Sequence, residues 1–283
     1  MKNSKGVLKS EQDPFIDILT MKMNMVQMPE VVDAAMAWIR EKRYGSYIAV
    51  CNAYDAVCCK KDPAVREAVN NSSLTVPDGI SMVKVANLYG YPLKRRVYGP
   101  DLMQALLSSG ENRESPPAGP AGKIENELRH FFYGTTDDTL EKLEKNLKEK
   151  YPRFIVAGKY APPFRPLTPE EDKKVIDMIN DAAPDILWVG LGCPRQQIWM
   201  YEHKDSLKVP VMVGVGAAFD FFAGTARQAP RWIRESGFEW LFRLCTQPKR
   251  LWKRYIIYGG AFVFYVTIQI VRHYLGKQRI AVE

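Results

Sequence analysis

Two apolar segments in the second half of the chain, each ending in Gly-x-Gly, most constrain what it can fold into. Residues 185–197 read DILWVGLGCPRQQ, and residues 209–220 read VPVMVGVGAAFD. A continuous apolar run of strand length that ends in glycine is typical of a buried strand in a parallel sheet. Ligands of open α/β sheets lie beyond the carboxyl ends of the strands, and glycine lets them approach the backbone. We therefore expect a binding site floored by Gly190, Gly192, Gly214 and Gly216. The alternative is that these glycines only shape tight strand-to-helix turns.

Strand-like and helix-like segments alternate from about residue 45 to residue 220. We expect strands at 45–53, 73–76, 130–133 and 153–157 in addition to the two glycine-ended runs. The helix after the first of these strands is interrupted at Asp62-Pro63, and Thr168-Pro-Glu-Glu171 is a helix N-terminus signature. Alternation of this kind predicts an α/β fold with a doubly wound, mainly parallel, Rossmann-like sheet.

The remaining segments set the domain limits. We expect one short strand at 15–19, followed by a Met-rich connection, and an exposed insertion at 108–122, which is rich in Gly, Pro and Ser. Residues 1–226 are predicted to form the α/β domain, and residues 227–283 a helical appendage with a different composition.

The positive charge of the chain lies in that appendage. Between Arg227 and Arg279 there are eleven Lys and Arg residues against two acids, Glu235 and Glu239, a net charge of +9 in a chain of net +8. A local basic block implies a polyanionic partner, which on charge alone is a phosphate-bearing ligand, a nucleic acid or an anionic membrane.

Residues 255–271 are uncharged, rich in aromatic side chains and flanked by Lys253, Arg254 and Arg272. A membrane-spanning helix needs about 20 apolar residues, and this run is shorter and contains Gln269. The pattern favours an element that lies at a membrane interface. A buried core or oligomer helix and a true span are the alternatives.

Several polar residues follow the expected strands. Asp78 lies in the Pro-Asp-Gly turn after the strand at 73–76, where a carboxylate can act as a general base. Asp220 has a similar position in the second glycine-ended segment, and Gln196 lies in the first turn of the helix after Gly192. Arg95 and Arg96 could hold a phosphate. For each residue, a purely structural role in a turn, a cap or a solvated charge pair is the alternative.

Three arginines in the appendage are spaced for one ligand. Arg243, Arg250 and Arg254 would lie on one face of a continuous helix, where three guanidinium groups suit a diphosphate. Pro248 predicts a break in that helix, and a basic stripe toward solvent or membrane is the alternative.

Other signals are missing. The third glycine of GxGxxG is absent, and there is no Walker A lysine motif and no Asp-x-Asp metal pattern. The five cysteines form no CxxC pair, which disfavours a zinc site or a disulfide framework and fits a reducing compartment.

Taken together, the motifs resemble the WecG/TagA/CpsF family of bacterial glycosyltransferases (glycosyltransferase family 26). The matching segments occur in family order and are DGI at 78–80, LYGYP at 88–92, RVYGPDL at 96–102, PPFRPL at 162–167, VGLGCPRQ at 189–196, GVGAAFDFFAG at 214–224, APRW at 229–232, EWLFRL at 239–244 and PKRLWKRY at 248–255. One departure is Val50, because the family often has Thr two residues before the Asn that corresponds to Asn52.

The resemblance implies an inverting hexosyltransferase that needs no metal or other cofactor. It would move a hexose, N-acetylhexosamine or its uronic acid from a UDP-sugar to a polyprenyl-diphosphate-linked glycan at the cytoplasmic face of the membrane. Catalysis is implied for Asp78 as general base and for Arg96. Substrate binding is expected from Asn52, Gly192, Gln196, Gly216, Asp220, Arg243, Arg250 and Arg254.

The same resemblance gives the appendage two roles, donor binding and peripheral attachment to an anionic membrane surface. No nucleic-acid partner is expected, and a homo-oligomer stays open. Two other readings remain: a nucleotide-dependent Rossmann-type oxidoreductase, which the missing third glycine disfavours, and a non-catalytic membrane-binding protein.

Overall fold

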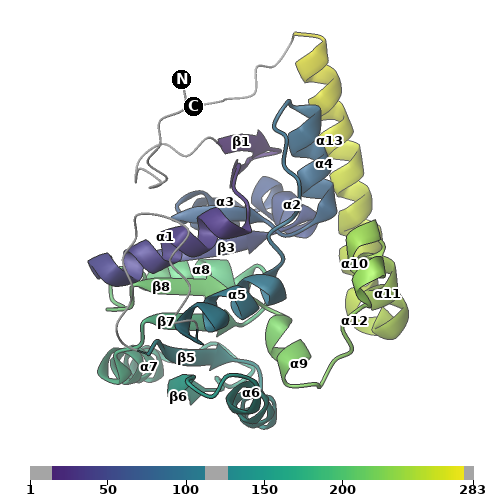
Figure 1. Ribbon diagram of the computed structural model, residues 1–283. Helices are drawn as coiled ribbons and strands as arrows, with labels where there is room; N and C mark the ends of the chain where they lie inside the picture. Colours follow the sequence, from purple (N-terminus) through teal and green to yellow (C-terminus); the bar gives the residue numbers. More distant parts are fainter. Residues whose placement is uncertain (1–14, 112–126, 277–283) are drawn as a thin grey trace.

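The computed structural model describes residues 15–111 and 127–276, and its centre is a six-stranded sheet in which every paired strand is parallel (Figure 1). The strand order is β4-β3-β8-β7-β5-β6. The strands are β3 (Ser46–Cys51), β4 (Leu74–Pro77), β5 (Arg129–Gly134), β6 (Ile155–Tyr160), β7 (Ile186–Gly190) and β8 (Val211–Gly214). The predicted α/β class and parallel sheet are therefore confirmed, and the two glycine-ended runs are adjacent central strands.

Helices cover both faces of this sheet, as a doubly wound fold requires. Alternate residues of β3 show the division: Ile48 and Val50 pack with α1 and α5, whereas Ala49 and Cys51 pack with α2 and α3. The first face is covered by α1 (Met28–Glu41), α5 (Gly99–Glu111), α6 (Asp137–Lys150) and α9 (Ala218–Phe222). The second is covered by α2 (Ala53–Lys61), α3 (Pro63–Asn70), α7 (Pro169–Ala182) and α8 (Arg195–His203).

The local start signals operate as the sequence predicts. Thr168 and Glu171 form a reciprocal capping box at the start of α7. The Asp62 side chain accepts a hydrogen bond from the Ala64 amide and separates α2 from α3, with Pro63 in the first turn of the new helix. These contacts satisfy amides that the first helical turn leaves without a partner.

Two predictions near the edges of the fold need correction. The Met-rich connection after the first short strand is itself a strand, because β1 (Phe15–Ile18) and β2 (Met21–Asn24) form an antiparallel hairpin with Met21 and Met23 buried. The predicted insertion begins too early, since α5 continues through Glu111. The part of the insertion at 112–122 lies outside the described residues.

The C-terminal segment is helical and packs against the body of the protein (Figure 1). It comprises α10 (Arg231–Ser236), α11 (Glu239–Thr246), α12 (Pro248–Trp252), a π-helical turn η1 (Lys253–Tyr258) and α13 (Gly259–Tyr274). Phe262 and Val266 of α13 enter the same core cluster as α2 and the β1–β2 hairpin. Gln269 accepts a hydrogen bond from the Leu19 amide at 2.8 Å and donates one to the Asp17 carbonyl at 2.7 Å.

The four glycines of the central strands divide into two pairs. At Gly190 a Cβ atom would lie 2.5 Å from the Phe219 ring, and at Gly214 it would lie 2.8 Å from Nε2 of Gln196. At Gly192 and Gly216 the backbone φ is +78° and +51°, and a Cβ would meet nothing closer than 3.6 Å. Packing explains the first pair, and turn geometry with open space beyond it explains the second.

We expect Gly190→Ala to lower the free energy of unfolding by about 1–3 kcal/mol, the usual cost of overpacking a core. The reason is that Phe219 is buried against Phe132, at a ring centroid distance of 5.7 Å, and has little room to move. The matched control is Gly260→Ala in α13, where a Cβ meets nothing within 4 Å. Urea denaturation of both variants tests this, and equal stability of the two would contradict the packing argument.

Candidate functional site

The predicted site residues meet where the parallel strands end. Asn52 follows β3, Asp78 follows β4, and Gly192 and Gly216 lie in the loops after β7 and β8. Since β4, β3, β8 and β7 are consecutive in the sheet, their carboxyl ends form one continuous edge. Parallel pairing thus gathers residues that are up to about 160 positions apart in the sequence.

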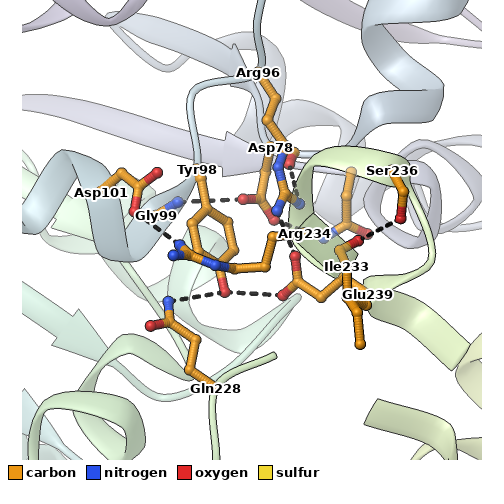
Figure 2. A network of polar contacts seen from close by, with 11 residues as sticks. Asp78, Arg96, Tyr98, Gly99, Asp101, Gln228, Ile233, Arg234, Ser236 and Glu239 are labelled. Atoms are coloured by element: carbon orange, nitrogen blue, oxygen red, sulfur yellow. Dashed lines mark hydrogen bonds and ion pairs between the residues drawn. The ribbon is translucent and has the colours of Figure 1, made fainter. Parts of the chain in front are cut away.

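Asp78 is held at this edge by contacts from three elements (Figure 2). Its Oδ1 accepts a hydrogen bond from the amide of Gly99, the first residue of α5, at 3.2 Å. Its Oδ2 accepts one from Nδ2 of Asn52 at 3.4 Å. The Arg96 guanidinium donates to the Asp78 carbonyl oxygen at 3.2 Å rather than to its carboxylate. The carboxylate is oriented, and within residues 15–111 and 127–276 no cation forms an ion pair with it.

The electrostatic surroundings prepare Asp78 to take up a proton. Burial raises the pKa of Asp78 above its ordinary value, the positive charge of Arg96 opposes the rise, and the negative charge of Glu239 adds to it. A carboxyl group with a raised pKa accepts a proton more readily than an exposed aspartate, which is the property that a general base needs.

Arg96 is held by Tyr98 from its own loop and by Glu239 from the C-terminal segment (Figure 2). Its guanidinium forms an ion pair with Glu239, the first residue of α11, and lies over the Tyr98 ring at 4.2 Å from the centroid. The Tyr98 hydroxyl donates to the other Glu239 oxygen at 2.8 Å, and Gln228 donates to that hydroxyl at 3.4 Å. Arg95, its partner in the predicted arginine fork, is exposed.

Asn52 joins the same region to the C-terminal segment. Its Oδ1 caps α2 by accepting from the Tyr54 amide at 3.0 Å, and it also accepts from Nη2 of Arg254 at 3.5 Å. The Arg254 guanidinium lies over the Tyr54 ring at 4.6 Å from the centroid. An amide side chain donates to Asp78 through its nitrogen and accepts from Arg254 through its oxygen at the same time, so asparagine suits this position.

A buried acid lies directly behind Asn52. Asp55 is fully buried. Its carboxylate accepts a hydrogen bond from the backbone N–H of Asn52 at 3.0 Å and one from Nε2 of Gln197 at 3.3 Å. Burial raises its pKa, and Arg254 is the largest opposing influence. A buried carboxylate favours a nearby cation, so Asp55 helps to hold Arg254 at the carboxyl edge of the sheet.

Gln196 lies at the base of the site, between the two glycine loops. It is buried; its Nε2 contacts Sγ of Cys193, and its Oε1 has no hydrogen-bond partner among the described residues. A Cβ on Gly216 would lie 3.6 Å from that oxygen. An unpaired buried acceptor is costly in a native structure, and a ligand hydroxyl or amide would satisfy it.

The other two predicted arginines lie beside Asp220. Nη1 of Arg250 is 3.9 Å from Oδ2 of Asp220, and the Arg243 guanidinium lies over the Phe221 ring at 5.6 Å. Burial raises the pKa of Asp220, opposed by Arg250 and then Arg243. The helix breaks before Pro248, as predicted, so the arginines do not form one straight stripe. Arg254 points to Asn52 instead.

Sequence reasoning assigned no role to three residues of this site. They are Tyr98, Glu239 and Asp55. For Glu239 a signal was present, since it is one of two acids in the strongly basic appendage. Nothing in the sequence marks Asp55 as different from any acid in a first helical turn, because its burial depends on α8 and on Arg254.

Among residues 15–111 and 127–276, no group of three or more His, Cys, Asp or Glu side chains is arranged to hold a metal ion. The positive charges at the site are supplied by arginine side chains.

The chain is similar to known proteins along most of its length. The model of the glycosyl transferase WecG/TagA/CpsF family matches residues 16–276. An N-acetylglucosaminyldiphosphoundecaprenol N-acetyl-beta-D-mannosaminyltransferase of Bacillus spizizenii is 27% identical over 84% of this chain and 86% of its own length. Proteins of the same name from Bacillus subtilis, at 27% identity over 76% of each chain, and Staphylococcus aureus, at 26% over 83% and 86%, are also similar.

A family match that spans both the parallel sheet and the C-terminal helices defines this protein as a glycosyltransferase. The chain belongs to the WecG/TagA/CpsF family. The resemblance recognised from the motifs is confirmed, and an oxidoreductase is excluded as its function.

Proposed function

We propose that this protein transfers an N-acetylmannosamine-type sugar from a UDP donor to a polyprenyl-diphosphate-linked acceptor with inversion at the anomeric carbon. The printed names of the relatives supply the sugar and the acceptor class. The observation that carries the proposal is the Asp78 carboxylate at the carboxyl edge of the sheet. It is oriented by two donors, has a raised pKa and interacts electrostatically with Arg254 of the C-terminal segment.

The chemistry requires one proton acceptor and one site for developing negative charge. Asp78 takes the proton from the acceptor hydroxyl, and the oxygen of that hydroxyl forms the new bond to the anomeric carbon. The bond from that carbon to the donor phosphate breaks, and its electron pair leaves with UDP. Arg243 and Arg250 then stabilise the diphosphate charge, a task that divalent cations perform in other enzymes. Gln196 and the Gly192 and Gly216 loops are proposed to contact the donor.

The ion pair between Arg250 and Asp220 fits this role. At 3.9 Å it is long, and the Arg250 side chain is 57% exposed, so the pair is weak. A diphosphate can therefore recruit Arg250 at small cost. Asp220 is proposed to hold Arg250 and Arg243 in place until the donor binds.

The C-terminal segment also presents an apolar surface suited to a membrane. Of the sixteen large apolar side chains that are exposed among the described residues, twelve lie between Trp232 and Leu275. They include Ile256, Val263 and Phe264, which are 57%, 61% and 62% exposed. Lys249 and Lys253 are exposed in the same segment and suit anionic headgroups. We propose peripheral attachment at the cytoplasmic face, where a lipid-linked acceptor is accessible.

A spanning helix is the competing arrangement. By length and composition alone, the helical run Pro248–Tyr274 could cross a membrane. However, α13 is fastened along one side to α2 and to the β1–β2 hairpin, and the ammonium groups of Lys60 and Lys61 lie over the rings of Tyr265 and Tyr258. A span would draw these charged neighbours into hydrocarbon, which is costly. An interfacial position avoids that cost.

The proposed reaction is tested by a donor screen with a polyprenyl-diphosphate-linked N-acetylglucosamine acceptor. We expect turnover with UDP-N-acetylmannosamine, and thermal stabilisation of the protein by UDP but not by NAD. Turnover of UDP-glucose instead of UDP-N-acetylmannosamine would contradict the proposed sugar but not the proposed reaction class. Absence of transfer from every UDP-sugar, together with no UDP binding, would overturn the proposal.

Asp78→Asn should fold normally and lose turnover by about 10²–10⁴-fold, because general-base assistance is removed while the side-chain shape is kept. In the unchanged enzyme the raised pKa of Asp78 predicts that kcat/KM falls with decreasing pH at a pH above the ordinary aspartate value of about 3.9. Steady-state kinetics across pH measure both. Near-normal kcat in the Asn variant would place the base elsewhere, with Asp220 the next candidate.

Arg250→Ala and Arg243→Ala should each raise the KM for the donor, since one charge-assisted phosphate contact is worth roughly 1.5–3 kcal/mol. Arg231→Ala is the matched control, because Arg231 is an exposed arginine of the same segment that pairs with Glu235. Calorimetry of UDP binding measures the effect. Unchanged UDP affinity in both variants would assign these arginines to the membrane surface.

Val263→Glu combined with Phe264→Glu should release the protein from vesicles that contain anionic lipid while leaving UDP affinity unchanged. Both side chains are exposed, so the substitutions leave Phe262 and Val266 in the core. Truncation after Tyr258 would remove those core residues and is a less specific test. Vesicle sedimentation gives the readout, and full retention of the double variant, even at high salt, would contradict the interfacial position.

A further inference from the structure

The side chain of Glu239 links the basic C-terminal segment to Arg96 and Tyr98, next to the proposed catalytic base. It is 7% exposed although it carries a charge, and it begins α11 in the basic C-terminal segment. Its two oxygens have different partners: one forms the ion pair with Arg96, and the other accepts from the Tyr98 hydroxyl. Both partners lie in the loop between α4 (Ile80–Leu88) and α5, which follows Asp78.

We infer that Glu239 is a positioning residue for the transfer reaction: it docks α11 onto the loop between α4 and α5, holds Arg96 next to Asp78 and sets the proton affinity of the catalytic carboxylate. The inference rests on the proposed role of Asp78 as general base. It adds to that role a residue that touches neither the base nor, in this arrangement, a substrate.

The geometry of Arg96 carries the argument. Its guanidinium has two acidic neighbours, Glu239 and Asp78, and it bonds to the Glu239 carboxylate but only to the backbone carbonyl of Asp78. An arginine that bonded directly to the Asp78 carboxylate would stabilise its ionised form and make it a poorer base. By occupying Arg96, Glu239 leaves the carboxylate of Asp78 with two weaker, uncharged donors, Asn52 and the Gly99 amide.

The charges that act on Asp78 can be assigned element by element. From the loop between α4 and α5 Arg96 favours the ionised carboxylate, and from α11 Glu239 disfavours it. Asn52, after β3, and the first amide of α5 favour the ionised form through their hydrogen bonds. Asp55 of α2 and Arg254 of η1 also interact with Asp78 electrostatically. Of these groups, Glu239 disfavours the ionised carboxylate of Asp78 and also forms an ion pair with Arg96, the cation that most favours it.

The docking function follows from the neighbouring contacts. Arg234 of α10 donates to Asp101 at 3.2 Å and also lies over the Tyr98 ring, at 5.6 Å from the centroid. Tyr98 thus contacts both Arg96 and Arg234, and its hydroxyl is bonded to Glu239 (Figure 2). These contacts fasten α10 and α11, which carries Arg243, to the α/β body just before α12, which carries Arg250.

The test compares Glu239→Gln with Glu235→Gln, the same chemical change four residues earlier at an exposed acid that pairs with Arg231. In Glu239→Gln we expect the acidic limb of the kcat/KM profile to move to lower pH, because loss of the negative charge and release of Arg96 both lower the pKa of Asp78. We expect kcat at neutral pH to fall about tenfold or more. Glu235→Gln should keep the profile of the unchanged enzyme.

A second pair of variants separates charge from docking. Tyr98→Phe removes one bond to Glu239 and keeps all charges, so turnover should fall with the acidic limb unmoved. Glu239→Asp keeps the charge and should restore the position of the limb, although its shorter side chain cannot reach both partners. A fall in activity of Glu239→Gln with an unmoved limb, or no change at all, would overturn the inference.

Hydrogen–deuterium exchange gives a readout that needs no substrate. We expect amides of 239–246 to exchange at least several-fold faster in Glu239→Gln than in Glu235→Gln, because α11 loses its attachment to the loop between α4 and α5. Equal exchange would contradict the docking function even if the enzyme is active. Absence of any UDP-sugar turnover by the unchanged protein would refute the proposed function, while the exchange comparison would still decide whether Glu239 docks α11.

Discussion

Parallel pairing of the central strands is the constraint on which the rest of this structure depends. When all strands run in one direction, their carboxyl ends share one edge, and every loop that leaves that edge faces the same region. The ends of β3, β4, β7 and β8 supply Asn52, Asp78 and two glycine loops from distant parts of the sequence. Helices on both faces bury the sheet and leave this edge as the place where polar side chains can converge.

The parallel sheet alone does not complete the proposed site, because Arg243, Arg250 and Arg254 come from the C-terminal helices. The C-terminal helices bring Arg243, Arg250 and Arg254 close to acids of the α/β body. Conversely, Glu239 of these helices forms an ion pair with Arg96 of the body. This exchange of charges explains how a strongly basic segment packs stably against a body that is close to neutral. It also means that the proposed donor site and the attachment of the segment use the same side chains.

The same segment is proposed to serve the membrane. Its inner side is fixed to α2 and the β1–β2 hairpin by Phe262, Val266 and Gln269, and its outer side exposes apolar residues. A rigid attachment of this kind would hold the catalytic edge at a constant position relative to the bilayer. For an enzyme whose acceptor is linked to a lipid, that arrangement limits the search for substrate to the membrane surface.

The amino-acid sequence by itself determined the α/β class, the order of most elements, the break at Pro248 and the family, because these follow from local patterns and ordered motifs. It proposed Asp78 from its turn after a predicted strand, Gln196 from the helix start after Gly192, and Asn52 from the family resemblance. Local pattern did not reveal β2, because four residues with two methionines give little periodicity. Only the tertiary structure decided that Gly190 and Gly214 are packing positions, that Arg254 separates from Arg250, and that Glu239 and Tyr98 hold Arg96. Each of these depends on contacts between segments far apart in the chain, and no spacing within one segment encodes such a contact.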